Sequence, residues 1–139
     1  MDKQSLMRLL IRVNRQRRNH MKPYYSEVGL TSLQISALFC ISDHPGRMQK
    51  EIAEDIGVSP TVLVGILRNL EEKNLVECTR PKYNRRAISV FLTDVGMQLV
   101  DMISLVVRES DAKALNGFSP EELETLRSLL LRISDNLQQ

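Results

Sequence analysis

Basic side chains gather in one short segment of the chain, RPKYNRR at positions 80–86, where four of seven residues are lysine or arginine. Side chains of this kind neutralise phosphate groups. At the tip of a loop they can also enter a narrow minor groove, where the negative potential is strongest. We therefore expect Lys82, Arg85 and Arg86 to contact the backbone or minor groove of a nucleic acid.

The sequence lacks the residue sets of common catalytic and metal sites. It has no Gly-rich phosphate loop and no Ser/His/Asp or Cys/His set worth assembling, and the neighbouring carboxylates Glu71 and Glu72 belong to an ordinary helix face. The two histidines, His20 and His44, have no metal-ligand spacing. We expect no enzyme, no cofactor and no metal site.

The residues before the basic segment predict two short helices joined by a tight turn. Ile52 and Ile56 repeat at helical spacing, and Gly57 follows where a helix end favours a left-handed residue. Ser59 can cap the next helix, and Pro60 suits its first position. Helix, turn with glycine, helix is the helix-turn-helix pattern, whose second helix can enter the major groove.

The second helix, expected over residues 60–73, has one apolar and one outward face. Thr61 can hydrogen-bond a base edge or touch a thymine methyl, and Arg68 can reach a phosphate or a guanine. Gly65 costs about 1 kcal/mol relative to Ala, so either another surface approaches it closely or nothing selects against it. Val62 and Val64 flank the outward face and make it less polar than a typical base-reading surface.

Two β-rich alternating runs, residues 75–79 and 87–92, flank the basic segment and predict a hairpin with a basic tip. A hairpin directly after a recognition helix is a wing. The expected nucleic-acid interface takes residues from the first helix of the motif, from the second helix and from the hairpin: Gln49, Lys50, Ser59, Thr61, Val62, Gly65, Arg68, Lys82, Arg85 and Arg86.

Charge is polarised along the chain. The net charge is +2, but residues 1–22 carry +6, residues 23–92 are neutral and residues 93–139 carry −4. The first helix and the wing are therefore candidate contacts for phosphate, although a charged helix face can also be simply solvated. No apolar run is long enough to span a membrane and no signal peptide is evident, so we expect a cytoplasmic protein. Cys40 and Cys78 are expected to be buried, reduced thiols.

The N-terminal part predicts an amphipathic helix over residues 6–21, followed by a loop, KPYYSEVGL, because Pro23 is expected to end the helix. Thr31 and Gln34 form a capping box that opens a second, buried helix. The segment DHPGR at positions 43–47 is expected to be a turn.

The C-terminal part predicts two more helices. Thr93 caps one that runs toward Ala114, Gly117 interrupts it, and Ser119 with Glu122 forms a capping box for the last helix. The apolar stripes exceed what one small core can cover. We therefore expect a homodimer in which the first, fifth and sixth helices pack against their symmetry mates.

Together these segments resemble the MarR (multiple-antibiotic-resistance regulator) family of winged helix-turn-helix transcription factors. The resemblance rests on GLTSLQ, HPGRMQKEIAEDIGVS, LRNLEEKNLVE and NRRAISVFLTDVG, and it covers nearly the whole chain. It implies an obligate dimer with two winged lobes that bind pseudo-palindromic operator DNA. It also implies that small-molecule effectors can bind between the dimerisation helices and the DNA-binding lobe.

The sequence departs from the family pattern in places. The wing pattern Asp-x-Arg maps to Asn84, Arg85 and Arg86, so the arginine is retained and the aspartate is replaced by an amide. Asn74 stands in place of the usual glycine after the recognition helix, and Met48 replaces the polar cap of the third helix. Val62, Val64 and Gly65 replace mostly polar residues, so specificity is expected to lean on few side chains, the wing and DNA shape. The first helix has no cysteine of the kind that peroxide-sensing members use there.

The predicted fold class is mainly α with a small β-hairpin wing (α+β), in a single domain over residues 1–139. Residues 1–30 and 110–139 are the expected dimerisation helices, 31–95 the winged helix-turn-helix lobe, and 93–115 a long connecting helix. The expected function is a homodimeric, sequence-specific regulator of transcription, more readily a repressor, that binds double-stranded DNA. The alternative is a winged-helix module that binds another protein, because the apolar Val62 and Val64 lie beside the supposed reading face.

Overall fold

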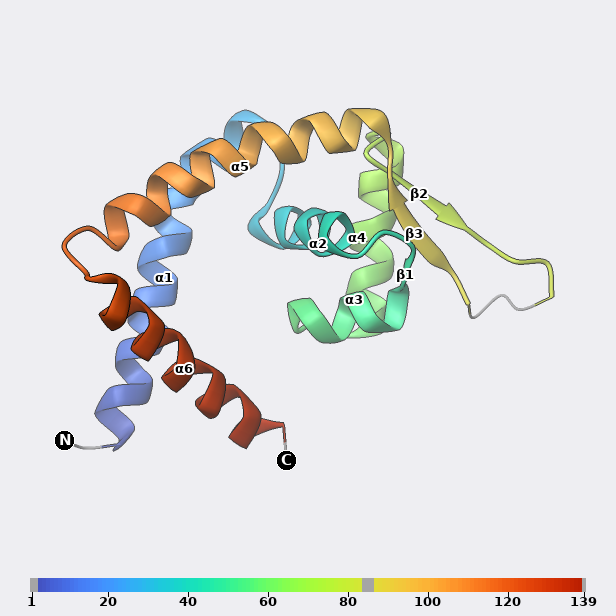
Figure 1. Cartoon of the computed structure of the whole chain (residues 1–139). Helices are drawn as coiled ribbons and strands as arrows, with labels where there is room; N and C mark the ends of the chain where they lie inside the picture. The colour runs from blue at the N-terminus through green and yellow to red at the C-terminus, as the bar shows by residue number, and fades with distance from the viewer. Residues whose placement is uncertain (1–2, 84–86, 139) are drawn as a thin grey trace. The chain divides into compact units, whose positions relative to one another are not determined.

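The computed structural model of the chain describes residues 3–83 and 87–138, and it falls into two compact units, Met1–Val107 and Arg108–Gln139. The order of elements along the described chain follows the prediction for a mainly helical winged fold (Figure 1). It is α1 (Lys3–Glu27), α2 (Ser32–Asp43), β1 (Arg47–Met48), α3 (Gln49–Ile56), α4 (Pro60–Glu72), β2 (Val76–Thr79), β3 (Ser89–Leu92), α5 (Asp94–Ala114) and α6 (Pro120–Leu137). Among the described residues, no helix combines the length and apolar character needed to cross a bilayer.

Helix α1 continues through Pro23 to Glu27, so the prediction that Pro23 ends it and that a loop follows was wrong. A proline inside a helix removes one backbone donor and its ring crowds the carbonyl four residues earlier, which costs about 3 kcal/mol. Met21 and Tyr25, on either side of Pro23, are buried in the core, and their burial holds the last turns in place. The helix ends at Glu27. Gly29, two residues later, has a left-handed φ of 72°, and the N–H of Leu30 donates to the carbonyl of Tyr25 at 3.0 Å.

Helix α2 is the centre of the first unit, as its apolar sequence predicted. Its residues Ile35, Leu38 and Ile41 are buried, and the helix contacts α1, α3, α4 and β3. The predicted capping box is confirmed. The Thr31 hydroxyl accepts from the Gln34 N–H at 3.2 Å, and the Thr31 N–H donates to the Gln34 side chain at 2.9 Å.

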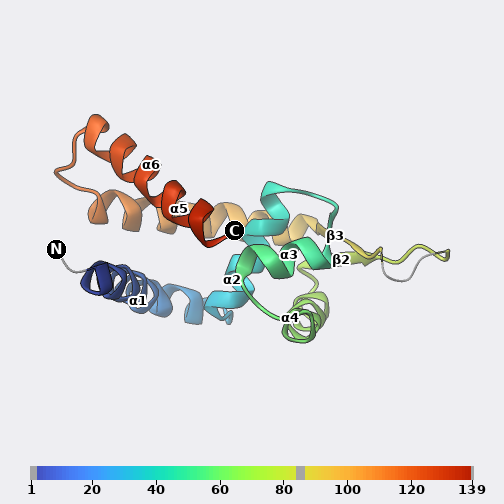
Figure 2. The ribbon, with the colours of Figure 1, turned by 90° about the horizontal axis from the view of Figure 1, so that it is seen from below.

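The helix-turn-helix is formed by α3 and α4, whose boundaries agree closely with the prediction. Gly57 ends α3 with a φ of 74°, and Met48 stands at its start with no side-chain capping bond. Asn74, which replaces the usual glycine after α4, has a left-handed φ of 59°, a conformation that asparagine tolerates. Figure 2 shows α4 at an edge of the first unit, so its outer face is open.

The three strands form one antiparallel sheet in the order β1-β3-β2. Val76 pairs with Leu92 and Thr79 with Ser89, which gives the predicted hairpin. Strand β1 was not predicted, because Arg47 was assigned to a turn. Two residues are too few to show a period-two pattern, and pairing with Val90 across the sheet places Arg47 in a strand.

The start of α5 fits closely against the base of the hairpin. The Thr93 hydroxyl accepts from the Gly96 N–H at 3.0 Å, which confirms the predicted cap. The Thr93 N–H donates to the carbonyl of Leu75 at 3.1 Å. A methyl group on Gly96 would overlap that carbonyl oxygen, so this crossing of backbones requires glycine.

The second unit contains the end of α5, a turn at Gly117 and helix α6. The predicted capping box is confirmed, because the Ser119 hydroxyl accepts from the Glu122 N–H and the Glu122 side chain accepts from the Ser119 N–H. None of the residues of α6 is buried. Its exposed apolar side chains include Leu126, Leu129, Leu130, Leu131 and Leu137.

Candidate nucleic-acid interface

The outer face of α4 is the centre of the candidate interface. Leu63, Leu67 and Leu70 are buried and fix the helix to the core. Four predicted contact residues face outward and are exposed: Thr61, Val62, Gly65 and Arg68. A helix that is anchored on one side and open on the other can enter a groove without rearrangement of its own core.

Ser59 has a structural role that precedes any contact with a nucleic acid. Its hydroxyl accepts from the Val62 N–H at 3.2 Å, and this bond sets the first turn of α4. A cap of this kind contributes about 1 kcal/mol. Ser59 is therefore a residue that positions Thr61 and Val62, and it remains exposed.

The structure brings Gln49 and Arg68 together at one open hollow of about 400 Å³ between α4, the start of α3 and the hairpin. Val64 and Arg80 also line this hollow. Lys50, the next residue of α3, is exposed. The predicted residues of α3 and α4 thus lie on neighbouring surfaces, and Val64 belongs to the hollow.

Arg80 follows β2 directly, on the turn side of the hairpin, and is already paired. Its Nη2 atom lies 3.3 Å from Oε1 of Glu71. Cys78 lies nearby, where burial and a hydrogen bond to Glu71 raise the pKa of its thiol to about 11. The pairing partly neutralises the positive charge of Arg80, whereas Lys50, Arg68 and Lys82 are exposed.

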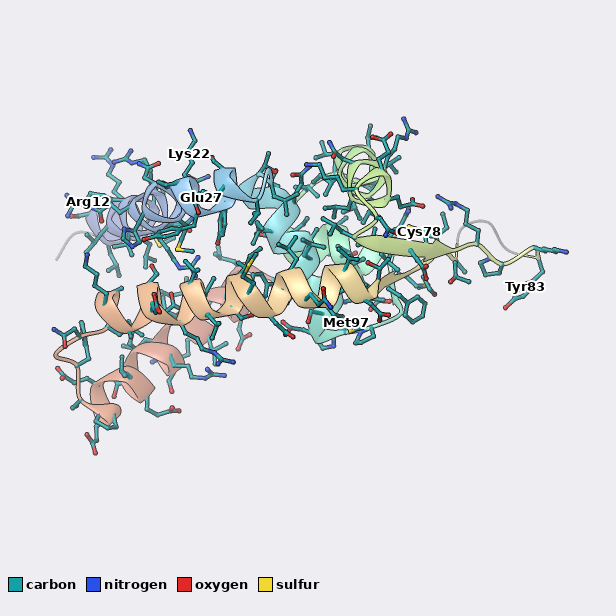
Figure 3. All side chains as sticks on the ribbon, turned by 90° about the horizontal axis from the view of Figure 1, so that it is seen from above. Arg12, Lys22, Glu27, Cys78, Tyr83 and Met97 are labelled. Carbon is teal, nitrogen blue, oxygen red and sulfur yellow. The ribbon has the colours of Figure 1, made fainter. Side chains whose placement is uncertain are left out.

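The tip of the hairpin extends away from the rest of the first unit. Lys82 is exposed there, and Tyr83 is 92% exposed and lies at the far end in Figure 3. Asn84, Arg85 and Arg86 lie outside the described residues, so the predictions made for them stay predictions. Tyr83 was not among the predicted contact residues, and its exposed aromatic ring follows Lys82 directly in the sequence.

A polar cluster centred on Arg47 connects α3, the first helix of the helix-turn-helix, to α2. Nη1 of Arg47 donates to Oδ2 of Asp55 at 2.6 Å and lies 3.0 Å from Sγ of Cys40. The hydrogen bond from Arg47 lowers the pKa of Asp55, and burial raises the pKa of Cys40. The cluster joins α2, β1 and α3, and no sequence pattern marked it, because its members are distant in sequence.

The two cysteines are free thiols. Cys40 is buried, as predicted, and Cys78 is only half-buried. Within residues 3–83 and 87–138, no group of three or more His, Cys, Asp or Glu side chains is arranged to hold a metal ion.

Comparison with known proteins finds relatives of the helix-turn-helix and hairpin segment. The model of the MarR family matches residues 30–88. The HTH-type transcriptional regulator YybA of Bacillus subtilis (strain 168) is 28% identical over 114 residues, which span 82% of this chain and 76% of YybA. Over these residues the chain is similar to the MarR family. The MarR match runs from the residue before the α2 capping box through the helix-turn-helix to the residue before β3.

Solved structures of other proteins share the fold of this chain. A putative MarR family transcriptional regulator from Listeria monocytogenes, complexed with a 26-mer DNA, has a TM-score of 0.88 at 24% identity, covering 94% of this chain and 87% of that chain. BpsR of Bordetella bronchiseptica, whose DNA binding is regulated by 6-hydroxynicotinic acid, has a TM-score of 0.83 at 19% identity, covering 94% and 98%. These two likenesses show the fold.

Proposed function

We propose that this chain is a homodimeric, sequence-specific transcriptional regulator, acting as a repressor on pseudo-palindromic operator DNA. The observation that carries the proposal is the outer face of α4, where Thr61, Val62, Gly65 and Arg68 are exposed while three leucines fix the helix from below. The hairpin follows α4 directly, and Lys82, between its two strands, is exposed. This is the arrangement in which a recognition helix enters the major groove and a wing contacts the backbone or minor groove.

The dimer is supported by apolar surface that one copy leaves open. Helix α6 has no buried residue, and the stripe predicted on α1 remains exposed at Leu6, Leu9 and Val13. Most helical stability in proteins comes from the packing of an amphipathic face, and these two apolar stripes are exposed in a single copy. A second copy of the chain would cover both stripes and bring two α4 helices to one duplex, as operator symmetry requires.

A binding experiment tests the proposal directly. Fluorescence anisotropy with genomic fragments and a random duplex pool, at several salt concentrations, should show a subset of fragments bound far more tightly than the pool. Arg68→Ala should weaken that binding. Lys113→Ala, which also removes one exposed positive charge but lies in the second unit, is the matched control. Equal binding by wild type and Arg68→Ala would contradict the role assigned to α4.

The proposal extends to a small-molecule effector at the hollow between α1 and α2. This hollow has a volume of about 440 Å³, within the range of small-ligand pockets, and Arg18, Lys22 and Ser32 are among its lining residues. Its two cations favour a small carboxylic acid. Titration of the DNA complex with 6-hydroxynicotinate and benzoate, in wild type and Lys22→Ala, tests it. The expected result is release of DNA from the wild type at lower acid concentration; no release of wild type at millimolar acid counts against this site.

The second candidate function is a winged-helix module that binds another protein. It is favoured by the exposure of Val62 and Val64, at 47% and 43%, on a helix that would otherwise be expected to present polar groups. The same anisotropy experiment separates the two functions. No binding to any duplex at low salt would support the protein partner and reject the regulator.

A further inference from the structure

Two exposed residues in the first half of α4, Val62 and Gly65, have no polar side-chain group. Val62 is 47% exposed, and a Cβ added to Gly65 would meet nothing within 4 Å. Gly65 has no positive φ, so the backbone does not require glycine there. Glycine in a helix interior costs about 1 kcal/mol relative to alanine. The fold gains nothing from the glycine, and the space that it leaves open lies outside the chain.

The two valines do not form one apolar patch. Residues two apart on a helix are separated by roughly 160° around its axis. Val64 lines the hollow that also contains Gln49 and Arg80, whereas Val62 lies on the other flank, one turn before Gly65. Thr61 and Arg68 project between the two flanks. Because a hydrophobic protein partner needs contiguous apolar surface, this arrangement disfavours such a partner.

Thr61, Val62 and Gly65 instead share one strip within the first two turns of the helix. The N-terminal residues of a recognition helix are those that approach base edges in the major groove. The only apolar group that a base pair presents there is the C5-methyl group of thymine. The exposed end of a valine side chain consists of methyl groups, which can pack against the methyl group of thymine. Because Gly65 has no side chain, the helix backbone there can approach the base edges more closely.

We propose that α4 recognises thymine through its 5-methyl group, which packs against the side chain of Val62 and the exposed backbone at Gly65. This inference rests on the proposed function, since it names what the same helix reads. The recognition is apolar, so the specific positions of the operator are A·T pairs, while Arg68 and the hairpin supply charge contacts. Val64, which belongs to the hollow, does not take part.

The experiment uses a duplex selected from a random pool by the full-length wild-type protein and then resynthesised with deoxyuridine in place of thymidine. Deoxyuridine removes only the methyl group and keeps every hydrogen-bonding atom. We expect the wild type to bind the uracil duplex about fourfold more weakly for each methyl group contacted. Val62→Ala should bind the thymine duplex more weakly and lose most of the difference between the two duplexes. Val64→Ala is the matched control and should keep the difference.

A second variant tests the close approach at Gly65. Gly65→Ala should raise the melting temperature, because the helix gains a better helix former in open space, and it should weaken binding to the selected thymine duplex at the same time. Higher stability with unchanged affinity would overturn the close approach.

The outcomes distinguish this inference from the function on which it rests. Equal binding of the thymine and uracil duplexes by the wild type would overturn thymine recognition and leave the regulator in place. Failure to bind any duplex would reject the regulator itself, and the inference would fall with it.

Discussion

The guanidinium of Arg47 donates to the carboxylate of Asp55 across 2.6 Å, and this contact joins the short strand before the helix-turn-helix to the last turn of α3. The same nitrogen lies 3.0 Å from the buried thiol of Cys40, on α2. Three elements thus meet at one cation. Because the Asp55 side chain is 53% exposed, solvent screens the ion pair, and its effect is chiefly on the placement of α3.

The Arg47 cluster predicts a pH dependence of stability. The hydrogen bond from Arg47 lowers the pKa of Asp55 in the folded protein, so its stabilising contribution is present above the unfolded value, about 3.9. It is lost as the pH falls through the lower, folded value. Asp55→Asn should therefore lower stability at pH 7 and show a smaller further loss on acidification. Urea unfolding at pH 7 and below pH 4 measures this. Parallel pH profiles for the two proteins would contradict it.

The thiols should react slowly. Burial raises the pKa of Cys40, and burial with Glu71 raises that of Cys78 to about 11, so both stay protonated at neutral pH. Reaction with an aromatic disulfide reagent, followed by absorbance, should be much slower than that of a free cysteine at pH 7.5 and should accelerate with pH. A Cys78→Ser variant assigns the phases. Rapid reaction of either thiol at pH 7.5 would contradict the raised pKa assigned to it.

Two glycine substitutions should change stability in opposite directions. Gly96→Ala places a methyl group on the carbonyl oxygen of Leu75, and we expect a loss of about 1–3 kcal/mol in the free energy of unfolding. Gly65→Ala places the same group in open space and should add up to about 1 kcal/mol. Urea titration of both variants beside the wild type measures the difference. Similar values for the two variants would contradict the close crossing of backbones at Gly96.

The dimer predicts a specific effect of charge on α6. Leu130→Asp introduces a charge on the stripe that includes Leu123, Leu126 and Leu137, and it should shift the protein from dimer to monomer in analytical ultracentrifugation. Ser128→Asp introduces the same charge on the opposite side of the helix and serves as the control. A wild type that sediments as a folded monomer at micromolar concentration would reject the dimer.

The wing predicts a change in the salt dependence of DNA binding. Lys82 is exposed in the hairpin turn, so Lys82→Ala should weaken binding to all sequences about equally. The slope of log K against log salt should fall by about one unit. Lys73→Ala is an informative comparison, because Nζ of Lys73 already donates to the carbonyl of Gly29 at 2.6 Å. An unchanged slope for Lys82→Ala would remove this residue from the interface.

Local signals in the sequence predicted much of the fold. The caps at Thr31, Ser59 and Ser119 depend on residues three positions apart, and such signals need no knowledge of the tertiary structure. The outward face of α4 followed from helical periodicity for the same reason. These features depend only on residues within one helical turn of each other or on the helical repeat itself.

The misses depend on contacts between distant residues. Pro23 is accommodated because Met21 and Tyr25 are buried against the core, which no local rule can state. Arg47 lies in a strand only because Val90 pairs with it. The side chains around Arg47 come from positions 40, 47 and 55, and their convergence exists only after α2 and α3 have packed.

The crossing at Gly96 also restricts which residue the chain can carry at the start of α5. The Leu75 carbonyl accepts from the Thr93 N–H, and a Cβ at position 96 would overlap the same oxygen. Any larger residue there would have to separate the first turn of α5 from the residue that precedes β2. The hairpin and the long helix therefore share one point at which the sequence has no freedom to vary without a change of structure.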